Sequence, residues 1–203
     1  MKKWLIPVIV IVALIAGFFI IKFAIGVSVN NKAIDLEENA KNSMADVQSA
    51  YQRRNDLIGN LVKTVQGAAD FERGTLTDVI EARAKATSVN IDASNLSASQ
   101  IEKFQEAQTG LSSALSKLLV SVERYPELKA TQNFSQLQAQ IEGTENRINV
   151  ARNRYNESVR EYNAYIRKFP FSFFGNTSEF EKMSMFKADA GADEAPDVEF
   201  DFK

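Results

Sequence analysis

The sequence predicts an all-α protein in which an N-terminal transmembrane helix continues into an antiparallel four-helix bundle with two long and two shorter helices. Three observations predict this fold: an uncharged apolar run near the amino terminus, apolar residues repeated every seven positions along two long segments, and no proline in the first of these segments. Seven-residue repeats are typical of packed helices. We divide the chain into a membrane anchor (1–28), a helical bundle (29–174) and an acidic, partly extended tail (175–203).

The amino-acid composition argues against catalysis. The 203 residues include no cysteine and no histidine, which removes thiol nucleophiles, disulfides, the usual zinc sites and the usual general base at neutral pH. We therefore expect no catalytic residue, no metal and no cofactor. Residues 33–178 carry 17 basic and 18 acidic side chains. Because this balanced region offers no basic face, nucleic acid is not an expected partner.

The anchor is the run WLIPVIVIVALIAGFFII, residues 4–21, which contains no charged residue. At about 1.5 Å per residue it is roughly as long as a bilayer core is thick. A cleaved signal peptide is the alternative, but the run is longer than a signal-peptide core and no A-x-A site follows it. Lys2 and Lys3 precede the anchor, and Lys22 follows it. This small excess favours a cytoplasmic amino terminus and an extracytoplasmic bundle.

The first bundle helix is predicted from residue 29 to about residue 69. Two seven-residue series mark its buried seams. They are Ala33, Ala40, Val47, Arg54, Leu61 and Ala68 in one series, and Met44, Tyr51, Ile58 and Val65 in the other. Because no proline separates the anchor from these series, we expect one helix to form both the anchor and a stalk.

Three further helices are predicted. A shorter helix covers 75–88, and a Ser- and Asn-rich loop over 90–99 ends in an N-cap serine before a third helix that runs to about residue 124. Pro126 ends it, because the residue before proline is pushed out of the helical conformation. The fourth helix runs from about residue 133 to residue 168, with its heptad at Phe134, Ile141, Ile148, Tyr155, Tyr162 and Phe169.

Short connections favour antiparallel neighbours, so the fourth helix returns the sequence FPFSFF, residues 169–174, to the membrane surface. One interpretation is a belt at the membrane interface, in which these phenylalanines touch lipid or the anchor helices of neighbouring copies. The residues that we expect at the membrane interfaces, one on each side of the bilayer, are Lys2, Lys3 and Trp4 before the anchor and Phe169, Phe171, Phe173 and Phe174 at the end of the fourth helix. The other interpretation is a hydrophobic plug that closes the open end of the bundle, and the sequence leaves both open.

Antiparallel packing of the first and fourth helices also predicts which residues lie level. If residue 28 leaves the bilayer where residue 169 returns to it, the numbers of facing residues sum to roughly 197, within about one turn. Arg54 interrupts an apolar seam and is then level with Glu145. We expect these two to form an inward, partly buried ion pair, and Asp46 and Arg152 to form a looser second pair. Such pairs disfavour slipped registers.

The fourth helix carries asparagine directly after three of its apolar heptad residues, at Asn149, Asn156 and Asn163. These positions lie at the rim of the core. Their carboxamides can be satisfied within the monomer or can form a contact stripe with a second subunit. Both uses stay open. The acidic tail ends with Val198, Phe200 and Phe202 alternating with acids, a pattern that fits either disorder or a strand paired with another copy or a partner.

Several motifs in order resemble the LemA family over nearly the whole chain. They are YQRRNDLIGNLV (51–62), EARAKA (81–86), RYPELKATQNF (124–134), EGTENRINVARNRYNESVREYN (142–163) and the FP at 169 and 170. The resemblance implies a membrane-anchored, mainly helical bacterial protein, and it offers no catalytic residues to carry over. Together with the single anchor, it leads us to expect a single-pass protein of the bacterial inner membrane. The chain departs from the family pattern at Gly59, where the motif usually has proline.

Two functions follow as hypotheses. In the first, the protein is structural: it self-associates as a homo-oligomer in the lipid bilayer and presents its bundle to other membrane or envelope proteins. In the second, an extracytoplasmic sensor-like bundle relays ligand binding to a separate membrane protein. A ligand pocket between helices would favour the second, and a solid core would count against it.

Overall fold

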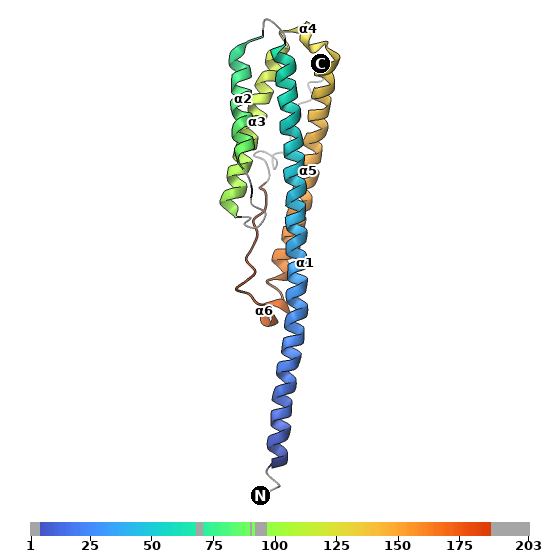
Figure 1. The fold of residues 1–203 in the computed structure, drawn as a ribbon, viewed down its shortest axis with the longest axis vertical. Helices are drawn as coiled ribbons and strands as arrows, with labels where there is room; N and C mark the ends of the chain where they lie inside the picture. Colours follow the sequence, from blue (N-terminus) through green and yellow to red (C-terminus); the bar gives the residue numbers. More distant parts are fainter. Residues whose placement is uncertain (1–4, 68–70, 90, 92–96, 188–203) are drawn as a thin grey trace, which may run out of the picture.

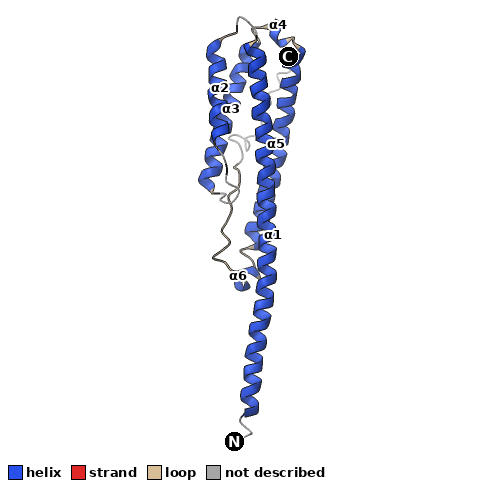
Figure 2. Cartoon of the chain, in the orientation of Figure 1, coloured by secondary structure: helices blue, strands red, loops and turns tan. Residues whose placement is uncertain are grey.

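The computed structural model of the chain describes residues 5–67, 71–89, 91 and 97–187 (Figure 1). Its helices are α1 (Leu5–Gln66), α2 (Arg73–Ser88), α3 (Ala98–Val122), α4 (Pro126–Lys129), α5 (Gln132–Tyr165) and α6 (Phe171–Phe174). Figure 2 draws no strand among the described residues. The all-helical prediction is confirmed.

A single helix, α1, runs for 62 residues from the anchor to the far end of the molecule. Its N-terminal part is long and apolar enough to cross a membrane. Apolar side chains from Val8 to Val27 on this part are mostly exposed, so the described residues leave most of this surface uncovered. Further along, from Val29 onward, the same helix buries a regular seam. Anchor and stalk are therefore one helix, without a linker between them.

The helices pack as two pairs. α1 packs most extensively against α5, α2 packs against α3, and α1 also contacts α2. At the end far from the anchor, side chains from α1, α2, α3 and α5 share one apolar core, which includes Leu61, Val79, Leu118 and Ile141. Nearer the anchor, the α1–α5 pair instead faces α6 and the chain that follows it (Figure 1).

Contacts between α1 and α5 fix their relative height. The hydroxyl of Tyr165 donates to the carbonyl of Val29 at 3.1 Å, and the Oγ atoms of Ser43 and Ser158 lie 3.0 Å apart. The residue numbers of these pairs sum to values within about one helical turn of the roughly 197 expected from the sequence. The last coil therefore runs back beside α1 toward the anchor, as the topology prediction requires.

The ends of the helices follow their local capping chemistry. Ser97, not Ser99, caps α3, and its side chain accepts a hydrogen bond from the backbone N–H of Gln100. Thr131 caps α5 in the same way, through the N–H of Phe134. Pro126 begins the short helix α4 instead of only ending α3.

Gly59 lies inside α1 where the resemblance expects proline. A Cβ at this position would lie 3.0 Å from Cζ of Arg83, and the Nε of Arg83 donates to the carbonyl of Asn55 at 2.8 Å. That carbonyl is the one that the N–H of residue 59 faces in an α-helix. Arg83, from the EARAKA motif, therefore supplies this carbonyl with a donor that does not depend on residue 59.

Helix α6 divides the phenylalanines of FPFSFF between core and surface. Phe171 is fully buried and contacts Phe180 edge to face, whereas Phe169 and Phe173 are 74% and 64% exposed. Phe174 is half-buried, and its carbonyl comes so close to α1 that a Cβ on Gly26 would lie 3.2 Å from it. The placement of Phe171 at a membrane interface is therefore wrong, because its side chain closes the core.

We predict that Phe171→Ala lowers the free energy of unfolding by about 3 to 5 kcal/mol, since it removes a fully buried ring. Phe173→Ala, in the same short helix, should change that free energy by about 0.5 kcal/mol or less, because its ring is exposed. Urea denaturation of the full chain in detergent, followed by circular dichroism, measures both. Equal decreases in the free energy of unfolding for the two variants would contradict the assignment of Phe171 to the core and Phe173 to the surface.

Candidate functional site

The residues after α6 form the most distinctive site of the structure. Residues 180–187, here called the strap, leave α6 and run along α5 toward the ends of α2 and α3 (Figure 1). Phe180 and Phe186 of the strap are buried, and Met183 between them is partly buried. The packed domain therefore extends to Lys187, beyond the boundary at residue 174 that the sequence predicts.

Two asparagines of α5 clamp the strap by its backbone. The carboxamide of Asn163 donates to the carbonyl of Met183 at 2.8 Å and accepts from its N–H at 3.0 Å. Asn156 does the same with Phe186, at 3.0 and 2.9 Å. Each side chain thus satisfies both backbone groups of one residue, as a neighbouring antiparallel strand would.

Two tyrosines of α5, each one position before a clamping asparagine, also donate hydrogen bonds to the strap. The hydroxyl of Tyr162 donates to the carbonyl of Glu181 at 2.9 Å, and that of Tyr155 donates to the carbonyl of Ser184 at 2.7 Å. Burial raises the pKa of Tyr155. Burial, together with the charges of Glu37 and Glu181, raises the pKa of Tyr162 to about 12. Both hydroxyls therefore remain protonated donors at neutral pH.

The clamps repeat because helix and strap have matching periods. Seven helical residues rise about 10.5 Å, and three extended residues span about 10 Å. Asn163 and Asn156 are seven residues apart, and the residues that they clamp, Met183 and Phe186, are three apart. The same three-residue step brings Phe180, Met183 and Phe186 onto the apolar surface of the helices.

The strap ends, within the described residues, at a polar entrance between α3 and α5. The carbonyl of Lys187 accepts from Nη2 of Arg152 at 2.7 Å and from Nε2 of Gln105 at 3.1 Å. The ammonium of Lys187 pairs with Glu102 at 3.0 Å. The guanidinium of Arg152 also lies over the ring of Phe186, 5.4 Å from its centre. These contacts tie the end of the strap to both helices.

The site decides how two of the three predicted asparagines are used. Asn156 and Asn163 are satisfied by the strap within the chain, which is the first of the two uses that the sequence leaves open. Asn149 is exposed, and no described residue pairs with its carboxamide. The remaining predicted contacts, Val198, Phe200 and Phe202, lie outside the described residues, as do Lys2, Lys3 and Trp4.

The structure brings Arg54 and Glu145 together. Nη1 of Arg54 lies 3.0 Å from Oε1 of Glu145 and donates to Ser112 at 3.1 Å, and Nη2 donates to the side chain of Gln108. Arg54 is 2% exposed, whereas the side chain of Glu145 is 43% exposed. The ion pair is therefore buried at its cationic end only.

The second predicted pair does not form between the residues named. Asp46 lies with Arg147 and Arg154 at a hollow between α1 and α5, whereas Arg152 faces α3 and the strap. The level of the two residues is similar, but they lie on different sides of α5. Similar height along the helices is not sufficient to predict an ion pair. Successive residues of a helix point about 100° apart, so a residue at the right height can still face a different neighbour.

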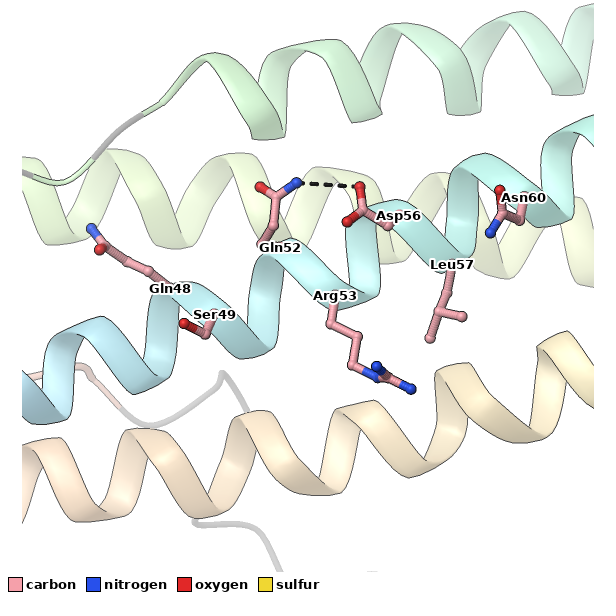
Figure 3. Close-up of a pocket in the computed structure, with 7 residues that line it drawn as sticks. All are labelled: Gln48, Ser49, Gln52, Arg53, Asp56, Leu57 and Asn60. Carbon is pink, nitrogen blue, oxygen red and sulfur yellow. Dashed lines mark hydrogen bonds between the residues drawn. The ribbon is translucent and has the colours of Figure 1, made fainter.

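Two surface hollows differ in what they bring together. A groove of about 450 Å³ lies between α3 and α5, beside the end of the strap, and Arg54, Gln108, Glu145, Asn149 and Arg152 contribute to its lining. Figure 3 shows the other hollow, lined by residues of α1 alone, where Gln52 donates to Asp56 at 3.2 Å. Of these two, the groove is the one that combines side chains from several helices.

We predict that replacing Asn156 and Asn163 together by alanine releases the strap. The change removes four hydrogen bonds to strap backbone, each of which contributes on the order of 1 kcal/mol. Hydrogen–deuterium exchange of residues 180–187 in the full chain should accelerate by about tenfold or more. Asn153→Ala is the matched control, because Asn153 is an exposed asparagine of the same helix. Unchanged exchange in the double variant would contradict the clamp assignment.

The pKa of Tyr162 predicts how stability depends on alkaline pH. Below pH 10, its ordinary pKa, the hydroxyl is protonated in both folded and unfolded chains and adds no pH dependence. Between pH 10 and about 12 only the unfolded chain ionises, so the free energy of unfolding falls as pH rises. Tyr162→Phe should make this fall shallower in urea denaturation. Identical slopes for the variant and the natural chain would argue against a buried, donating hydroxyl.

Comparison with known proteins places these features in a family. A sequence model of the LemA family matches residues 43–200. Protein LemA of Metamycoplasma hominis is 22% identical over 139 residues, 64% of this chain and 60% of that protein. Magnetosome protein MamQ of Magnetospirillum gryphiswaldense is 24% identical over 175 residues, 77% of this chain and 64% of that protein. The chain thus spans less than two thirds of the length of either relative.

Proposed function

Because the chain belongs to the LemA family, and is therefore a membrane-associated helical protein, we propose that it acts as a self-associating structural protein of the bacterial inner membrane. In this proposal the anchor spans the bilayer once, the helical domain stands outside the cytoplasm as an antiparallel four-helix bundle, and its surface receives other envelope proteins. Its role is to hold and present, without catalysis of its own.

The observation that carries the proposal is the continuity of α1. One helix includes the exposed apolar segment from Val8 to Val27 and the buried seam that begins at Val29. Because no linker separates them, association of two anchors in the bilayer would also set the distance and orientation of the two domains. A catalytic domain on a tether would not need this coupling.

Two features support contacts of the anchor region. Ala13 and Gly17 are spaced as small residues are in associating transmembrane helices, and nothing in the structure lies within 4 Å of a Cβ built on Gly17. Phe169 and Phe173 are exposed beside the level of Gly26, where α1 would leave the bilayer. Exposed aromatic rings at that height favour lipid headgroups or the anchors of neighbouring copies.

A second candidate function is a sensor that relays ligand binding to a separate membrane protein. The groove between α3 and α5 favours it, because side chains of several helices converge there around the Arg54–Glu145 pair. A ligand in this groove would contact Arg54 of α1. Helix α1 is continuous with the anchor.

The mass of the full-length chain in detergent tests the leading proposal. We expect an oligomer, and we expect Gly17→Leu to lower its mass, since a large side chain would keep the anchors apart. Ile15→Leu, on the opposite side of the same helix, should leave the mass unchanged. A strictly monomeric natural chain would remove self-association from the proposal and leave the sensor reading in its place.

A further inference from the structure

We propose that the groove between α3 and α5 binds the chain's own acidic C-terminal segment, residues 188–203, and that Asn149 holds the backbone of this segment as Asn156 and Asn163 hold the strap. The groove would then be a docking site for a segment of the same chain. This proposal does not depend on the membrane role proposed above.

The first argument is register. Along α5 the clamps occur at Asn163 and Asn156, and Asn149 is the next residue in the same seven-residue series. Along the strap the clamped residues are Met183 and Phe186, so the next three-residue step is residue 189. The strap runs toward Asn149, because its clamped residue numbers rise as those of α5 fall. A third clamp is thus ready at the height where residue 189 would arrive.

The second argument is that the chain and the helix surface under it both change from apolar to charged at the same point. Where Phe180 and Phe186 face the helices, the surface is apolar and contains Phe171, Tyr155 and Phe104. Beyond Lys187 the groove lining contains Arg152 together with the Arg54–Glu145 ion pair, so its net charge is positive. The next residue in the three-residue step is Asp189. An apolar series over an apolar surface is therefore followed by an acid at a groove whose lining is net positive.

The third argument is the position at which the strap enters the groove. Arg152 and Gln105 both contribute to the groove lining, and both donate to the carbonyl of Lys187. The chain is therefore delivered to the mouth of the groove by residues that belong to it. The sixteen residues that follow contain six acids and one lysine, and three extended residues suffice for each clamp step.

We assign the groove to a segment of the same chain, and not to a second copy, because the effective concentration of the chain's own segment is high. Residue 188 is bonded to a residue whose carbonyl is already held at the groove, so its effective concentration there is on the order of millimolar or higher. Another copy would have to displace it. The groove would thus be available to foreign acidic peptides only when the chain's own segment leaves.

The absence of native cysteine allows a direct test in the full-length chain. One variant carries Thr109→Cys and Ala190→Cys, which place one thiol in the groove and one beside Asp189. The control carries Arg147→Cys and Ala190→Cys, because Arg147 lies at the hollow on the α1 side of α5. Both are treated with a short bismaleimide after circular dichroism has shown that they are folded.

We expect the first pair to cross-link within one chain with about ten times the yield of the control, as a docked segment requires. Adding Asn149→Ala to the first pair should lower its yield toward that of the control, whereas adding Asn146→Ala should not. Equal yields for the two pairs, or a yield that Asn149→Ala leaves unchanged, would overturn the proposal. Cross-links that join two chains would also overturn it and assign the groove to a second copy.

Discussion

The structure depends on one spatial agreement: the rise of seven helical residues nearly matches the span of three extended ones. Because of this agreement, one seven-residue repeat of α5 supplies contacts both to the helical core and to the strap. Tyr155 and Tyr162 are buried in the core that α5 shares with α1, and their hydroxyls reach the strap. The following residues, Asn156 and Asn163, clamp the strap backbone. A helix with any other apolar period would lose this correspondence after a few turns.

This arrangement also explains how a helical protein satisfies an extended segment without a sheet. Backbone groups that pack against a core must find partners, and an isolated strap has no neighbouring strand. Asparagine is a mediocre helix former, but its carboxamide carries a donor and an acceptor in the same geometry as a peptide group. The modest cost in helix propensity is offset by two hydrogen bonds at each clamp. Packing of Phe180 and Phe186 supplies the apolar part of the stabilisation.

The sequence predicted what periodicity within helices can predict. The seams of α1 and α5 placed Arg54 level with Glu145, and the apolar run placed the anchor. The sequence analysis missed the strap because the partners of Asn156 and Asn163 lie outside the helices. The strap is marked in the sequence only by a short series of apolar residues every three positions, Phe180, Met183 and Phe186. This series would have to be matched with the asparagines that recur every seven positions in α5. Phe171 could not be separated from Phe169 and Phe173, since burial at a tight corner depends on tertiary packing.

The uninterrupted α1 has a mechanical consequence. From residue 28 to its end the helix extends about 57 Å, and after Pro7 it contains no proline at which it would kink. Transmembrane helices tilt to match bilayer thickness, commonly by about 20°. A change in tilt of about 10° would swing the far end through roughly 10 Å. With the anchor across the bilayer as proposed, α1 would act as a lever, and local lipid thickness would set the reach of the distal surface.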